Sequence, residues 1–277
     1  MKKSVLLGTA LCCLLTACEN IEKKAGEKLR QARLAYEAGR YNEAKTQIDS
    51  IKLLYPKAFD TRRAGIYLMQ DIELAEQRKT LAYLDSALQV RLTELESRKG
   101  RFVLEKDTVY QQTGHYLAPS QVIEKNLHRS YLRFQTDETG LMTLTSIYCG
   151  SRSIHHTSVK VTAPDGTFAQ TPPSKDSYET SDLGEQIEKA DYKLGEDGGV
   201  IQFVAQHKDQ NLRVTYEGDR TQSTIMTRAD RQAADEVYRL SLLLSSITQL
   251  KKDMEEAQMK IRFVEENIKK RITDKEK

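Results

Sequence analysis

The chain has 277 residues, and its 43 lysines and arginines against 40 aspartates and glutamates leave a formal charge of +3. The two signs are interleaved, so the composition gives no support for nucleic-acid binding, which needs a basic surface. The length suggests one large domain or two modest ones.

The chain begins with the pattern of a secretory signal. A basic start precedes a nearly unbroken apolar run over 5–15, which is too short to span a bilayer, since a spanning helix needs about 20 apolar residues. The next residues, Leu15-Thr16-Ala17-Cys18, resemble the bacterial lipobox. This resemblance implies that 1–17 is a lipoprotein signal peptide and that Cys18 carries a diacylglycerol and a further acyl chain such as palmitate. An ordinary cleaved signal is the alternative.

Processing of this kind would leave a single thiol. Cys12 and Cys13 lie within the signal and Cys18 would be acylated, so Cys149 alone remains. No disulfide within one mature chain is then expected.

The residues after the anchor bear on the side of the membrane that the protein faces. Glu19 and Glu22 resemble acidic signals that export lipoproteins to the surface in some Gram-negative groups, but Lys23 and Lys24 interrupt them. We therefore expect an anchor in the outer membrane, and the protein could face either the periplasm or the cell surface.

Residues 18–58 contain a short helical hairpin pattern that resembles one tetratricopeptide repeat. The matching positions are Ala32, Gly39, Tyr41, Ala44, Ile48, Ile51 and Pro56. Small alanines let two helices approach closely, and Gly39 suits the turn between them. A lone hairpin cannot form the peptide groove of a repeat array, so we interpret it as a packing device, with a partner groove as the alternative.

Two long amphipathic helices are predicted over 60–103 and 229–272, within segments 59–105 and 228–277. The first has apolar residues at intervals of seven: Tyr67, Leu74, Leu81, Leu88, Leu95 and Phe102. The second has its apolar residues mostly at alternating steps of four and three, from Ala233 to Ile268. Both patterns are typical of coiled coils. Because the lengths match, we expect an antiparallel stalk within one chain, although a dimeric coiled coil produces the same pattern.

Residues 106–227 are predicted to form an antiparallel β sandwich or barrel. Three hairpins are expected, at 129–149 around Asp-Glu-Thr-Gly, at 159–171 around Pro-Asp-Gly, and at 199–218, where 199–206 is read as a strand. Residues 171–193 are polar and are interpreted as a long surface loop with one strand, where ligand contacts are most easily placed. The predicted fold class is therefore α+β.

Cys149, His155 and His156 are the candidates for chemistry because a thiol and an imidazole can form a nucleophile–base pair or ligate zinc. No C-x-x-C pair or second histidine cluster accompanies them, and no orienting group is apparent. We therefore interpret Cys149 as a small buried apolar residue and predict no catalytic residue, no metal ligand and no cofactor.

The whole chain resembles uncharacterised bacterial lipoproteins that join a repeat-like hairpin, a coiled coil and a β domain. The sequence predicts a non-enzymatic envelope spacer or adaptor that is bound to the membrane through Cys18 and contacts an envelope protein. The alternative is a surface receptor for a glycan or peptide. A hydrolase has no supporting residues.

Overall fold

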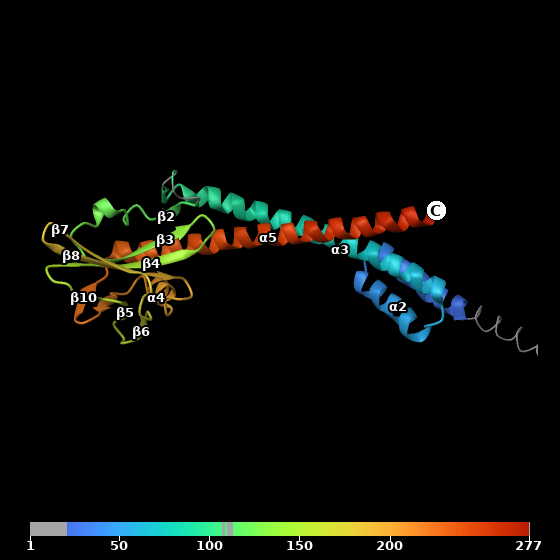
Figure 1. Ribbon diagram of the computed structural model, residues 1–277, viewed down its shortest axis with the longest axis horizontal. Coiled ribbons are helices and arrows are strands. Elements are labelled where there is room, and N and C mark those ends of the chain that lie inside the picture. The colour runs from blue at the N-terminus through green and yellow to red at the C-terminus, as the bar shows by residue number, and fades with distance from the viewer. Residues whose placement is uncertain (1–20, 107–108, 110–112, 277) are drawn as a thin grey trace, which may run out of the picture. The chain divides into compact units, whose positions relative to one another are not determined.

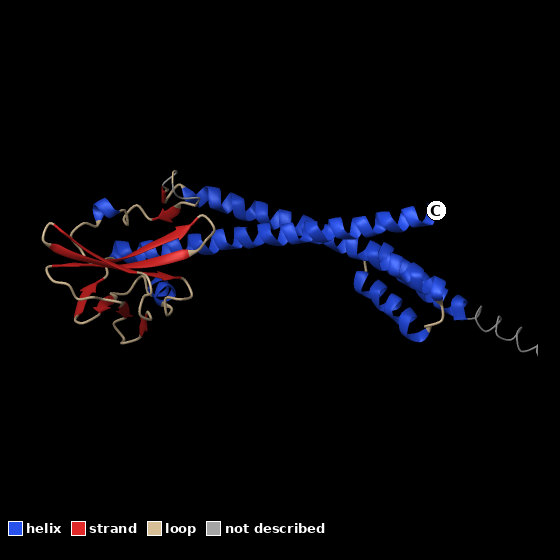
Figure 2. Cartoon of the chain, in the orientation of Figure 1, coloured by secondary structure: helices blue, strands red, loops and turns tan. Residues whose placement is uncertain are grey.

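The computed structural model describes residues 21–106, 109 and 113–276, and its contacts divide the chain into two units. The helical unit comprises the described residues up to Ser86 together with those from Lys252 onward, and the β unit comprises Ala87–Lys251. Every strand belongs to the β unit (Figures 1 and 2). The predicted α+β class is confirmed.

The N-terminal part of the helical unit is the expected hairpin. A helix described over 21–37 turns at Gly39, whose φ of 72° suits a residue without a side chain, into α2 (Tyr41–Leu54). Ala32 and Ala44 are fully buried where the hairpin packs. The same core includes residues of the next helix, so the hairpin covers its apolar face on a neighbour within the chain.

The two long helices are α3 (Phe59–Lys99) and α5 (Arg228–Glu276), close to the predicted bounds. Within the helical unit the two helices run antiparallel. Asp71 of α3 pairs with Arg271 of α5, and Arg78, further along α3, pairs with Glu265, which comes earlier in α5. The guanidinium of Arg271 also lies 4.9 Å from the ring centroid of Tyr67. The pairing of two sequence-distant helices of one chain is therefore confirmed.

The apolar stripe of α3 makes a stability prediction. Leu88 is 8% exposed whereas Val90, two positions on, is 65% exposed. We expect Leu88→Ala to lower the free energy of unfolding by about 2–5 kcal/mol, and Leu81→Ala, at a half-buried position, by less. Val90→Ala should stay within about 0.5 kcal/mol. Urea unfolding of the three variants measures this, and equal losses at Leu88 and Val90 would contradict the buried stripe.

The β unit contains two antiparallel sheets. The first has the order β1-β2-β3-β4-β8-β7, with strands Val103–Glu105, His115–Leu117, Tyr131–Asp137, Met142–Gly150, Glu185–Lys193 and Ser177–Asp182. The second has the order β10-β9-β5-β6, with strands Thr221–Ile225, Arg213–Glu217, Ser158–Thr162 and Phe168–Gln170. A 3-10 turn, η1 (Ile123–Lys125), precedes β3.

One apolar core fills the space between the sheets. Side chains on the inner face of the first sheet, such as Phe134 and Leu144, share it with Val159 and Val214 of the second. The first part of α5 adds Val237. The predicted sandwich is confirmed, and so are the hairpins β3–β4 and β5–β6.

Two local predictions were wrong. Residues 200–206, expected as a strand, form the helix α4 (Val200–Gln206). Asp197 accepts hydrogen bonds from the N–H groups of Gly195 and Ile201, and Gly198 and Gly199 take positive φ, so this turn starts a helix. The segment 171–193, expected to hold one strand, holds both β7 and β8, joined at Leu183-Gly184 with positive φ at both residues.

Candidate functional site

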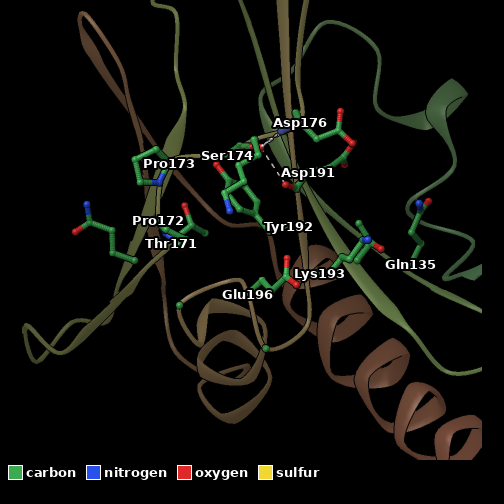
Figure 3. Close-up of a pocket in the computed structure, with 15 residues that line it drawn as sticks. Gln135, Thr171, Pro172, Pro173, Ser174, Asp176, Asp191, Tyr192, Lys193 and Glu196 are labelled. Atoms are coloured by element: carbon green, nitrogen blue, oxygen red, sulfur yellow. Dashed lines mark hydrogen bonds between the residues drawn. The ribbon is translucent and has the colours of Figure 1, made fainter.

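The β unit has a groove of about 1040 Å³ beside the segment that joins β6 to β7 (Figure 3). Residues 170–176 form one wall. The other lining residues come from strand positions and from the turn before α4: Gln135, Thr143, Asp191, Tyr192, Lys193, Gly195, Glu196 and Gly198. The polar segment expected to carry ligand contacts therefore lines this groove.

The wall at 170–176 is held in place by hydrogen bonds. Thr171 exchanges two with the backbone of Val159, and the Ser174 N–H donates to the carbonyl of Thr157 at 2.7 Å. The Ser174 hydroxyl bonds the carbonyl of Asp191 at 3.0 Å. The intervening Pro172 and Pro173 have fixed φ angles, so the groove is pre-formed and little conformational entropy is lost on binding.

Charged residues of both signs line the groove. Lys175 and Lys193 are basic, whereas Asp176, Asp191 and Glu196 are acidic. Tyr192 is the aromatic residue among the lining side chains, but it is only 4% exposed, and its hydroxyl donates to the carbonyl of Thr157 at 2.6 Å. The groove therefore offers no aromatic ring for a sugar to stack on, and its mixed charges suit a polar peptide.

A second cluster lies inside the sandwich, where Ser146, His156 and Glu188 form a hydrogen-bonded chain. The Ser146 hydroxyl lies 2.8 Å from Nε2 of His156, and Nδ1 of His156 lies 2.9 Å from the Glu188 carboxylate. This order of hydroxyl, imidazole and carboxylate is that of a hydrolase triad. All three residues are at most 2% exposed, so a substrate cannot reach the hydroxyl in this conformation.

The carboxylate of Glu188 is the acceptor at the centre of this cluster. One oxygen accepts from the Ser153 hydroxyl and from the N–H groups of Ile154 and His155, at 2.6 to 2.9 Å. The other accepts from the N–H and the ring of His156. Burial raises the pKa of Glu188, but these donors outweigh burial and lower it to about 2. The ionised carboxylate holds the loop 153–156 against the sheet.

The predicted candidates Cys149, His155 and His156 do not come together. The His156 side chain faces the core. Cys149 follows the inward-facing Tyr148 and therefore lies on the outer face of β4. It is half-buried, so the prediction of a buried Cys149 was wrong. Burial and the adjacent Glu185 raise the pKa of the Cys149 thiol, which opposes a nucleophilic role. The His155 ring instead bonds Glu179 at 3.0 Å.

His155, Glu179 and Glu188 place ligand atoms within 4.8 Å of one another. A cation there would have to displace donors from Glu188, because both of its oxygens already accept hydrogen bonds. His155 Nδ1 is likewise shared with both oxygens of Glu179. The cluster therefore fits an internal ion-pair network better than a metal centre.

The residues for which an anchor and an export signal are predicted lie partly outside the described part of the chain. The signal peptide 1–17, the lipidation residue Cys18 and Glu19 all lie there. Glu22 is described, and its carboxylate accepts from the Thr61 hydroxyl at 2.6 Å and from the Asp60 N–H at 3.3 Å, at the start of α3. It therefore has a structural role at a helix N-terminus.

The helical unit has a cleft of about 480 Å³ between α2 and α3, with Ile48, Ile51, Ile66 and Met69 among its lining residues. Its lining includes charged residues of both signs, so the charge of the cleft does not favour either an acidic or a basic partner. None of the helices in the described part of the chain has both the length and the apolar composition to cross a bilayer.

Comparison of the chain with protein-family models, with curated proteins and with solved structures finds no match.

Proposed function

We propose that the chain is a non-enzymatic envelope lipoprotein that acts as a spacer and adaptor, with Cys18 as its membrane anchor and the β unit as its protein-binding part. The observation that carries this proposal is the pre-formed groove of about 1040 Å³ along 170–176, which charged residues of both signs line. The long helices support the spacer role, because 41 and 49 residues at 1.5 Å per residue give the helices, each by itself, lengths of about 62 and about 74 Å.

A glycan or peptide receptor on the cell surface is the alternative. The groove favours a protein partner over a glycan because its one aromatic lining residue, Tyr192, is buried. The inaccessible Ser146–His156–Glu188 cluster favours a non-enzymatic role over a hydrolase.

Site-specific photo-crosslinking in the native host tests the adaptor role. A benzophenone amino acid replaces the exposed Pro173 in the groove, and a matched variant carries it at the exposed Asp219 in the β9–β10 turn. We expect a discrete adduct with another protein from position 173 and none from position 219. Equal adducts from both positions, or none from either, would contradict binding through the groove.

The anchor is tested separately. Cells fed an alkyne fatty acid should label the wild-type protein, whereas Cys18→Ser should lose the label and leave the membrane fraction. Protease treatment of intact cells, with lysed cells as control, then decides between the surface and the periplasmic face. A labelled Cys18→Ser protein would contradict the assigned acylation residue.

A further inference from the structure

The strand β7 lies at the edge of the six-stranded sheet of the β unit, and no role has been given to it above. β8 is the strand that pairs with β7, which ends the six-stranded sheet (Figure 1). Apart from the half-buried Thr180, the residues of β7 are all exposed. Exposed edges present unpaired N–H and C=O groups to other chains.

The register identifies which backbone groups are free. The Asp191 N–H donates to the Asp176 carbonyl at 3.0 Å, so Asp176 and Asp191 form a hydrogen-bonded pair. In an antiparallel ladder such pairs alternate, so Tyr178, Thr180 and Asp182 also direct their N–H and C=O groups to β8. Ser177, Glu179 and Ser181 therefore direct theirs away from the sheet.

The charge of this edge limits what can pair with it. Glu179 and Asp182 lie on β7, and Asp176 immediately precedes it, whereas the strand has no lysine or arginine. Pairing β7 with a second copy of itself would put four carboxylates along two strands, which opposes self-association. Tyr178 and Leu183 add apolar area, since they are 61% and 85% exposed.

The edge is continuous with the groove. Residues 170–176 form the groove wall and lead directly into β7, so a segment lying along the edge would continue beside that wall. The β7–β8 hairpin closes at Leu183-Gly184, with φ of 47° and 83°, in the conformation that matches strand twist. The edge is thus held in strand geometry before any partner binds.

We propose that β7 binds an extended, lysine- or arginine-bearing segment of the partner protein by antiparallel strand addition to the backbone of Ser177, Glu179 and Ser181. This inference rests on the proposed adaptor function and names its mode of binding. Main-chain hydrogen bonds supply affinity. The carboxylate of Asp182 and that of Glu179, which remains 47% exposed although it bonds His155, select basic side chains on the incoming strand.

A proline variant tests the backbone contact. Ser181→Pro removes an N–H that faces away from β8, so the β7–β8 ladder keeps its hydrogen bonds, and Ser181→Ala is the matched control that retains the N–H. The probes are two fluorescein-labelled hexapeptides, Lys-Thr-Lys-Val-Lys-Thr and Glu-Thr-Glu-Val-Glu-Thr, titrated with the full chain in phospholipid nanodiscs and followed by fluorescence anisotropy.

We expect the basic peptide to bind at least tenfold more tightly than the acidic one, and Ser181→Pro, but not Ser181→Ala, to weaken it at least tenfold. The double variant E179K/D182K, which leaves the backbone unchanged, should reverse the preference. Unchanged binding by Ser181→Pro with a native circular dichroism spectrum, or an unchanged preference in E179K/D182K, would overturn the proposal. If Ser181→Pro unfolds, E179K/D182K still decides.

Photo-crosslinking separates this inference from the adaptor function. Ser181→Pro should abolish the adduct formed from position 173. An undiminished adduct would overturn strand addition while the adaptor function stands, whereas no adduct in the wild-type background would contradict the adaptor function itself.

Discussion

Replacing Glu188 by Gln is expected to lower the free energy of unfolding of the β unit by about 3–5 kcal/mol, because removing one partner of a buried charged network leaves the others uncompensated. The Glu188 side chain is 2% exposed and accepts from five donors of residues 153–156. The glutamine amide has nearly the same volume as the carboxylate, but its NH₂ group is a donor and would face the N–H and O–H donors that now bond Glu188. Chemical unfolding followed by circular dichroism measures the loss.

Glu179→Gln is the matched control. Glu179 also bonds a residue of this loop, His155, but its side chain is 47% exposed, so the variant should cost less than about 1 kcal/mol. Similar losses for the two variants would contradict the special position of Glu188.

The same carboxylate predicts a pH dependence. Its folded-state pKa of about 2 lies below the ordinary value of 4.5, so its stabilisation is fully present above pH 4.5 and is lost as the pH falls toward 2. The difference of about 2.5 units corresponds to about 3 kcal/mol. We expect the melting temperature of the wild type to fall across this window more steeply than that of Glu188→Gln. Parallel curves would contradict an ionised Glu188.

The buried cluster also supports the groove. Thr157, which follows the loop held by Glu188, accepts hydrogen bonds at one carbonyl from the Ser174 N–H and the Tyr192 hydroxyl. Ser174 belongs to the groove wall and Tyr192 to the adjacent strand. The network that resembles a catalytic triad therefore positions the wall of the groove, and its loss should disturb the groove as well as the core.

The sequence predicted the elements whose signal is local. The seven-residue repeat of α3 and the turn residues around Gly140 and Gly166 specify helix length and hairpin position directly, and both were confirmed. Residues 200–206 were assigned wrongly because a short apolar run fits a strand or a buried helix, and the turn at Asp197 decided between them.

The candidate site was only partly predictable. Composition predicts that the polar segment 171–193 is a surface loop where ligand contacts are most easily placed, and its first part, 171–176, lines the groove, but the groove also needs strand positions as distant as Gln135. The buried cluster was missed because Ser146, His156 and Glu188 meet through the β4–β8 register, which no spacing in the sequence encodes. The one sequence signal for the cluster was that Ser146 and Glu188 are polar residues on faces of β4 and β8 that also carry buried apolar residues.

Gly140 ends the turn between β3 and β4, and its replacement by Ala is expected to have the second large effect. Its φ is 95°, and an added Cβ would collide with the backbone nitrogen of Ser245 on α5. Its carbonyl accepts from the hydroxyls of Ser241 and Ser245 at 2.7 and 3.1 Å, and Thr248 bonds the carbonyl of Thr139 at 2.9 Å. The turn is therefore fastened directly to the helix.

We expect Gly140→Ala to cost about 3–5 kcal/mol, the sum of an unfavourable φ, a backbone collision and weakened hydrogen bonds. Gly166→Ala is the matched control, because Gly166 has a similar φ of 89° in the β5–β6 turn but no atom within 4 Å of an added Cβ. That variant should cost about 1 kcal/mol, so the difference between the two isolates the contact with α5. Equal losses in urea unfolding would show that the turn is not packed on the helix, and the β3–β4 hairpin would then have to be held by the sheet alone.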